Sequence, residues 1–283
     1  MYKMSLLLLG FVMCTPLAYS AQPVEIATYD VLPPYAYRDE QGKLTGVYIE
    51  IVNTAISRMP GYSVTYNVLP WARAKVSVKH GKAFAILPPY FHAHDWLTDT
   101  EPKRPYIWPY SLPLYTQKDV VICNTEVMTQ PRKSYPEDFE GLSFIMWRGD
   151  GRAGVAFDNM VSEKRIKVTL VDSIKDKIKL LLLGRFDCTV TSKLPFYWDV
   201  AQLKKSEKLK PLKKTVQLKQ VAVISKNDGY LGYSDIDAEK NFPYKKDFSI
   251  KFDIEIYKMK QSGELDDIVS RFVNVKDIEL VSP

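Results

Sequence analysis

The sequence predicts an α/β protein made of two units, one of which is inserted into the other. Strand-like and helix-like segments alternate along the first part of the chain, and the alternation restarts after a Pro- and aromatic-rich stretch at residues 105–115. Such alternation is typical of a largely parallel sheet covered by helices. The chain has 283 residues, of which 46% are hydrophobic and 25% charged, which is enough for two packed cores.

The first unit opens with the order β-α-β-α-β. Alternating apolar residues predict its strands, and apolar residues four apart, such as Ile51 and Ala55, predict its first helix. Gly81 provides a stop for the second helix. The expected strands cover residues 24–29, 62–69 and 84–87, and the expected helices cover residues 47–59 and 71–80.

The second unit repeats the alternation, and the chain then returns to the first. Its expected strands cover residues 120–123, 142–148, 167–171 and 186–190, with helices at 154–160 and 174–183. An extended segment at residues 216–225 precedes a helical tail at residues 247–273. We therefore place a first lobe at 21–117 plus 217–283 and a second lobe at 118–216, joined by two crossing segments.

The N-terminus has the pattern of a secretory leader. Lys3 precedes the apolar residues 6–13, and the small residues Ala18 and Ser20 predict cleavage before Ala21, so residues 1–20 are a signal peptide. The apolar run is shorter than the roughly 20 residues that span a bilayer. We expect a periplasmic protein. The net charge of +6 is spread along the chain and does not favour nucleic acid as a partner.

Two cysteines follow the leader, Cys123 and Cys188, each in an apolar, strand-like run. An exported protein can form disulfides. Buried free cysteines also behave as small apolar residues. We expect buried free thiols, with a disulfide as the alternative.

A glycine-rich segment, GDGRAG, occupies residues 149–154 between a predicted strand and a predicted helix, and Asp172 ends the next strand. This is the context of a dinucleotide-binding turn. Nicotinamide cofactors are scarce outside the cytoplasm, and the unit is too small for a full dinucleotide domain, so we expect no cofactor. A glycine turn without a ligand is one alternative. We favour a small-anion contact and take Arg148, Asp150 and Gly151 as candidate ligand-binding residues.

Neither a metal site nor a catalytic motif is predicted. His92 and His94 would share one face of a strand, but no third ligand is identifiable, so we interpret them as polar loop residues. The sequence has no nucleophile elbow, no P-loop and no paired-histidine metalloprotease motif, and its three histidines offer little material for acid–base catalysis.

Aromatic residues and arginines are concentrated in the first unit, several of them in loops after strands. Ligands of open α/β sheets bind at such strand ends. Aromatic faces beside an arginine suit a small molecule with a ring or cation and a carboxylate. The candidates from this group are Tyr29, Tyr35, Trp71, Arg73, Tyr90 and Arg104.

From residue 24 to 272 the sequence resembles the bacterial extracellular solute-binding proteins of family 3, the amino-acid-binding receptors of ABC importers. The matching segments are PPY at 33–35, GKLTG at 42–46, YSLPLY at 110–115, DFEGL at 138–142, LLGRFD at 182–187 and GEL at 263–265. The resemblance implies a periplasmic-binding-protein-like type II clamshell with two crossover hinge segments. It also implies a monomer that captures a small-molecule ligand for an inner-membrane ABC permease or a sensor.

The resemblance implies two site residues. Arg104 has the spacing to Tyr115 of the family's arginine that clamps an α-carboxylate, with Arg73 and Trp71 as competing contacts. Ser192 stands where amino-acid-binding members place an Asp that pairs with the ammonium group. Losing such a charge-assisted hydrogen bond costs about 1.5–3 kcal/mol, which argues against an ordinary amino acid.

The resemblance extends to a few periplasmic cyclohexadienyl dehydratases, so a lyase is the alternative function. Such an enzyme needs a carboxylic acid in its pocket, and Glu50, Glu101 and Asp150 are the candidates. Nothing in the sequence marks them as perturbed. We expect a binding protein without catalysis, which captures a small polar or aromatic carboxylate-bearing ligand between the lobes for uptake or sensing.

Overall fold

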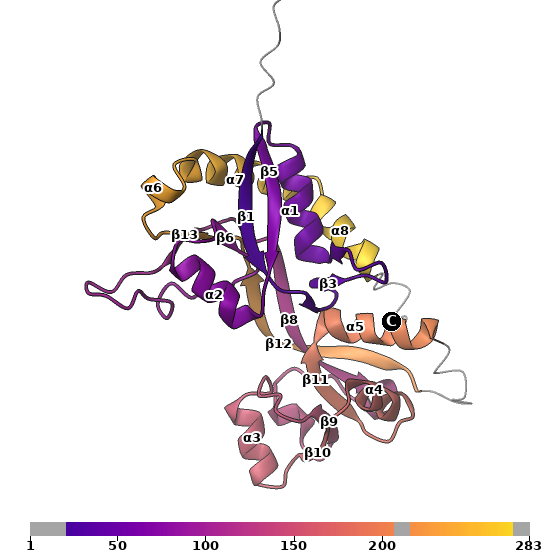
Figure 1. Ribbon diagram of the computed structural model, residues 1–283. Coiled ribbons are helices and arrows are strands. Elements are labelled where there is room, and N and C mark those ends of the chain that lie inside the picture. Colours follow the sequence, from indigo (N-terminus) through magenta and orange to yellow (C-terminus); the bar gives the residue numbers. More distant parts are fainter. Residues whose placement is uncertain (1–20, 207–215, 274–283) are drawn as a thin grey trace, which may run out of the picture.

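The computed structural model describes residues 21–206 and 216–273, which form two α/β lobes connected by a pair of long strands (Figure 1). The sheet of the first lobe has the order β5 (Tyr62–Val68), β1 (Gln22–Thr28), β6 (Ala85–Ile86), β13 (Gly232–Ser234) and β7 (Ile107–Tyr110). The sheet of the second lobe has the order β10 (Lys167–Val171), β9 (Ser143–Trp147), β11 (Cys188–Ser192), β8 (Tyr115–Asn124) and β12 (Leu218–Gly229). The α/β fold class predicted from the sequence is confirmed.

Helices cover the first sheet and bury its apolar side chains. They are α1 (Val47–Ser57), α2 (Trp71–Lys79), α6 (Ala238–Asn241), α7 (Lys245–Gln261) and α8 (Glu264–Phe272). The apolar stripe of α1 includes Ile51 and Ala55, both fully buried, and the helix packs on β5, α7 and α8. Gly46 precedes α1 with a φ of 128°, and a Cβ there would lie 2.4 Å from the carbonyl oxygen of Tyr35. Glycine at this position therefore lets α1 approach the loop that carries Tyr35.

The second lobe repeats the pattern with α3 (Val155–Ser162), α4 (Ile174–Leu182) and α5 (Lys193–Lys205). Ser173 caps α4 by accepting a hydrogen bond from the backbone N–H of Asp176 at 3.2 Å. Short 3-10 turns at Thr125–Val127 and Glu137–Phe139 and a small sheet of β2 (Val31–Leu32), β3 (Ala36–Arg38) and β4 (Leu44–Thr45) complete the described elements. Helices α5 and α6, strands β7 and β13 and this small sheet were not predicted from the sequence.

The long strands β8 and β12 form an antiparallel ribbon that runs between the lobes (Figure 1). Its register extends from Leu218 opposite Asn124 to Gly229 opposite Tyr115, with irregularities in β12 between Gln220 and Ser225. The predicted return of the chain to the first lobe at residue 217 falls just before β12, which pairs with β8 from Leu218 to Gly229. We call residues 115–119 and 225–229 of this ribbon the hinge ribbon.

The expectation of free thiols is wrong, because Cys123 and Cys188 form a disulfide. Both residues are fully buried, as expected, but Cys188 of β11 lies directly opposite Cys123 of β8 in the antiparallel register. Facing cysteines on neighbouring strands are close enough to bond. The sequence showed two buried strands without showing that they are neighbours.

The predicted signal peptide, residues 1–20, lies outside the described part of the chain, which begins at residue 21. In residues 21–206 and 216–273, no helix combines the length and apolar character needed to cross a bilayer.

Candidate ligand-binding site

A cavity of about 320 Å³ lies in the first lobe beside the hinge ribbon. It forms where β1 and β6 end and α2 begins, which is the edge of an α/β sheet at which ligands bind. Aromatic side chains make up most of its wall. The lining residues are Tyr29, Val31, Leu32, Tyr35, Tyr48, Trp71, Pro88, Tyr90, His92, Trp96 and Gln117.

The aromatic wall is held together by ring contacts. Trp71 meets Tyr29 edge-on with ring centroids 5.3 Å apart, and His92 stacks on Trp96 with centroids 4.7 Å apart. His92 and Trp96 come from the long connection between β6 and β7, which projects from the first lobe in Figure 1. Rings fixed in this way give a rigid surface for an apolar or cationic group.

Two tyrosine hydroxyls in this wall lack a hydrogen-bond partner among the described residues. The hydroxyl groups of Tyr35 and Tyr48 are buried, and none of the described residues bonds to them. Burial raises the pKa of both groups, so they are neutral hydroxyls. A buried polar group without a partner costs free energy, and a ligand oxygen or nitrogen in the cavity could satisfy it.

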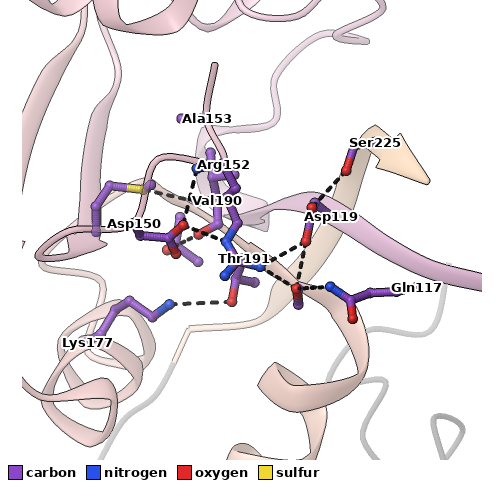
Figure 2. Close-up of polar contacts among 12 residues, drawn as sticks. Gln117, Asp119, Asp150, Arg152, Ala153, Lys177, Val190, Thr191 and Ser225 are labelled. Carbon is purple, nitrogen blue, oxygen red and sulfur yellow. Dashed lines mark hydrogen bonds and ion pairs between the residues drawn. The ribbon is translucent and has the colours of Figure 1, made fainter. Parts of the chain in front are cut away.

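A polar cluster lies on the second lobe, centred on Arg152 (Figure 2). Its Nε donates to Asp150 Oδ1 at 2.6 Å, and its Nη1 donates to Asp119 Oδ1 at 2.8 Å and to Ser192 Oγ. Asp119 also accepts hydrogen bonds from Ser192 Oγ at 2.6 Å and from Ser225 Oγ at 2.7 Å. We call Asp119, Asp150, Arg152, Ser192 and Ser225 the polar cluster.

The glycine-rich turn explains how Arg152 reaches this position. Gly149 and Gly154 have φ values of 83° and 85°, which favour glycine, and they turn the chain between β9 and α3. Between them, Asp150 Oδ1 accepts a hydrogen bond at 3.2 Å from the backbone N–H of Arg152, whose side chain it also binds. The turn therefore presents a guanidinium group, which is an anion-binding group in itself.

Gln117 of the hinge ribbon joins the cavity to the polar cluster. It lines the cavity, its Nε2 donates to Ser192 Oγ at 3.1 Å, and its Oε1 accepts from the Tyr90 hydroxyl at 2.8 Å. Burial raises the pKa of Tyr90; the charge of Asp119 raises it further and that of Arg152 lowers it. Gln117 thus lines the aromatic cavity and is hydrogen-bonded to the polar cluster.

A buried lysine of α4, Lys177, lies beside the polar cluster and contacts Thr191 (Figure 2). Burial lowers the pKa of Lys177 to about 8, while the charge of Asp150 acts in the opposite direction. Its Nζ donates to Thr191 Oγ1 at 3.4 Å. On α5, burial raises the pKa of Asp199 to about 6. Of these two titratable groups, Lys177 is buried and Asp199 is half-buried.

The structure brings six of the candidate residues to this site. Tyr29, Tyr35, Trp71 and Tyr90 line the cavity, and Asp150 and Ser192 belong to the polar cluster. Ser192, at the end of β11, carries no charge, and its hydroxyl donates a hydrogen bond to the Asp119 carboxylate of β8.

Four candidate residues lie elsewhere. The Arg104 side chain is 52% exposed and pairs with Asp235 at 3.4 Å in a separate groove, so its position does not support a carboxylate clamp in the cavity. Arg73 is exposed on α2, and Arg148 is exposed and pairs with Asp172 at 2.7 Å. Gly151 is exposed, with nothing within 4 Å of the position of a Cβ.

Several residues of the site were missed, namely Gln117, Asp119, Arg152, Tyr48 and Trp96. Arg152 lay within the glycine-rich segment, which was interpreted through its backbone and not through its side chain. Asp119 directly precedes the strand predicted at residues 120–123, but the observed strand β8 begins at Tyr115 and includes it. His92, interpreted as a polar loop residue, lines the cavity. Within the described ranges, no three His, Cys, Asp or Glu side chains gather as a metal site would require.

Two α/β lobes on a two-strand ribbon, with a ligand-sized site beside the ribbon, define a type II periplasmic-binding-protein fold. The chain belongs to the bacterial extracellular solute-binding proteins, family 3, whose family model matches residues 24–275. The class of protein is therefore a bacterial extracellular solute-binding protein. Members of this family are extracellular or periplasmic.

Solved structures agree in fold. The second substrate-binding domain of a putative amino acid ABC transporter from Streptococcus pneumoniae has a TM-score of 0.64 at 15% identity, covering 88% of this chain and 99% of its own. Substrate-binding domain 2 of Lactococcus lactis GlnP, in an open conformation, has a TM-score of 0.62 at 14% identity, covering 89% and 95%. The unliganded, open L-cystine receptor of Neisseria gonorrhoeae has a TM-score of 0.60 at 19% identity, covering 89% and 92%. A comparison with curated proteins gave no match.

Proposed function

We propose that this protein is a periplasmic receptor whose lobes close on a small amino-acid-like ligand that carries an aromatic or apolar group. The ligand's apolar part occupies the aromatic cavity, and its polar end meets the polar cluster. The observation that carries this proposal is the position of Gln117, which lines the cavity and bonds to Ser192 of the cluster.

Arg152 is the proposed carboxylate clamp. Its Nε and Nη1 bond within the polar cluster, whereas its Nη2 makes no hydrogen bond to any residue in the described part of the chain. The side chain is 30% exposed, so solvent or a ligand can reach it. A ligand carboxylate can accept from Nη2 while the two acidic residues hold the guanidinium plane in place.

Asp119 is the proposed partner of a ligand ammonium group. A carboxylate offers about four lone-pair positions, and the described hydrogen bonds of Asp119 use three of them. The remaining position can accept one N–H from the ligand. This arrangement replaces the charge that Ser192 lacks, so a zwitterionic ligand fits the site despite the serine.

Closure of the lobes follows from the same geometry. The cavity wall belongs largely to the first lobe and the polar cluster to the second, so a ligand that contacts both favours the closed state over the open one. Delivery to an inner-membrane ABC permease or to a sensor is the proposed use, and a monomer is the proposed state. The lyase alternative is not part of the proposal, because Asp150, the one candidate acid in the polar cluster, is bonded to Arg152.

The test is a pair of arginine variants. Amino acids and small aromatic or aliphatic acids are first screened by the rise in melting temperature and by intrinsic tryptophan fluorescence. Arg152→Gln is then expected to raise the dissociation constant of the tightest ligand by about tenfold or more, since a hydrogen bond to a charged group contributes about 1.5–3 kcal/mol. Arg104→Gln is the matched control and should leave affinity unchanged.

Two results would contradict the proposal. If Arg104→Gln weakens binding and Arg152→Gln does not, the clamp is in the first lobe and the assignment is wrong. If no ligand in the library shifts the melting temperature of the intact protein, the receptor function itself loses its support. N-terminal sequencing of the exported protein tests the predicted cleavage before Ala21.

A further inference from the structure

A second cavity, of about 570 Å³, lies against the hinge ribbon and is separate from the candidate ligand site. Residues of the hinge ribbon, the start of α5, the end of α7 and α8 surround it. Its wall therefore combines elements of both lobes. Four lysines line it, Lys118, Lys193, Lys226 and Lys260, against one acidic residue of the described chain, Asp266.

The hinge ribbon has two chemically different faces. Gln117 and Asp119 serve the candidate ligand site, and side chains of successive strand residues point to opposite faces. Lys118 therefore lies on the other face, where it lines the second cavity together with Lys226. Lys118 and Lys226 are direct cross-strand partners in the antiparallel register.

A facing pair of lysines is unfavourable by itself, because like charges directly opposite one another in a sheet repel. The side chains of Lys118, Lys226 and Lys260 make no hydrogen bond or ion pair with any residue that the structure describes. The repulsion is thus not relieved within this part of the protein. A bound anion between the ammonium groups would convert the repulsive pair into two attractive contacts.

The start of α5 adds to the positive potential. Lys193 and Leu194, its first residues, line the cavity. Ser192 precedes the helix, but its hydroxyl donates to Asp119 and caps no N–H group of α5. The positive end of a helix of 13 residues therefore lies at the cavity without a side-chain cap.

We propose that this hinge cavity binds a small phosphate-type oxyanion. Lysine ammonium groups are compact point charges that bind phosphate well, and uncapped N–H groups at a helix start supply directional donors. The cavity is large enough for pyrophosphate or for the phosphate group of a larger molecule. The site is independent of the amino-acid-like ligand proposed for the other cavity.

Pyrophosphate binding is measured by isothermal titration calorimetry on the full mature chain at low ionic strength. The double variant Lys118→Gln/Lys226→Gln is expected to weaken binding by at least about tenfold. Its melting temperature should not fall, because the substitution removes a repulsive pair. The control Lys219→Gln/Lys246→Gln removes the same net charge from β12 and α7, away from the cavity, and should bind as the wild type does.

Phosphatidylglycerol vesicles distinguish a lipid headgroup from a soluble phosphate. Binding to vesicles without binding to pyrophosphate, and its loss in Lys118→Gln/Lys226→Gln alone, would assign the same site to a headgroup. The proposal is overturned if the wild type binds neither probe. It is also overturned if both double variants weaken binding equally, since the effect would then come from net charge alone.

Discussion

Asp119→Asn tests the polar cluster most directly, because this carboxylate joins three of its members. Its side chain is 10% exposed and accepts hydrogen bonds from Arg152, Ser192 and Ser225. The amide keeps the shape of the side chain but removes the charge and turns one acceptor into a donor. The guanidinium group keeps Asp150 as its partner at 2.6 Å.

The magnitude follows from these contacts. Hydrogen bonds to charged groups contribute about 1.5–3 kcal/mol each. We expect Asp119→Asn to lower the free energy of unfolding by about 2 kcal/mol, because Arg152 remains paired with Asp150 and is partly solvated. For a protein of this size, that corresponds to a fall in melting temperature of about 4–8 °C. Circular dichroism and differential scanning calorimetry at neutral pH and moderate salt measure it.

The control is Asp172→Asn in the same lobe. Asp172 is 77% exposed and pairs with the exposed Arg148, and exposed ion pairs contribute about 0–1 kcal/mol. Its melting temperature should stay close to that of the wild type. If Asp119→Asn melts at the wild-type temperature, or if both variants lower the melting temperature equally, the polar cluster does not stabilise the second lobe.

Two further predictions concern the second lobe. Replacing Cys123 and Cys188 by alanine opens a loop with a sequence separation of 65 residues. The greater entropy of the unfolded chain then lowers the free energy of unfolding by about 4 kcal/mol, which is measured as a lower urea midpoint. Reducing the disulfide of the wild type should lower the midpoint by the same amount. Burial lowers the pKa of Lys177 to about 8, so the unfolded chain binds more protons than the folded one above that pH, and stability should rise between pH 8 and 10. Lys177→Met should be more stable than the wild type at pH 7, by roughly 3 kcal/mol, and its stability should not rise between pH 8 and 10. If the variant and the wild type show the same pH dependence, Lys177 does not titrate in this range.

Periodicity in the sequence predicted most of the elements. The four-residue spacing of Ile51 and Ala55 reflects the buried face of α1 and needs no knowledge of its neighbours. Helix α5 was missed because it begins after a strand without a turn signal and carries Pro195 in its first turn. Proline is tolerated there, since the first N–H groups of a helix have no intrahelical partner.

The site was predicted less completely, because its charged members come together only through the tertiary fold. Arg104 has the spacing of a clamp, but the long connection before it carries the residue to Asp235 on another surface. Arg152 and Asp119 are far apart in the sequence, and their ion pair depends on how the turn after β9 faces the hinge ribbon. The aromatic cavity was more accessible, since its residues follow recognisable strands.

The disulfide also affects how the molecule can move. It joins β8 to β11 inside the second sheet, beyond the part of β8 that carries Asp119. Because neighbouring strands are covalently linked, we expect this sheet to move as a rigid body and any rotation between the lobes to occur near Tyr115 and Gly229, where the pairing of β8 and β12 ends. We therefore expect a ligand to bind where the position of Asp119 is already fixed by the sheet before binding.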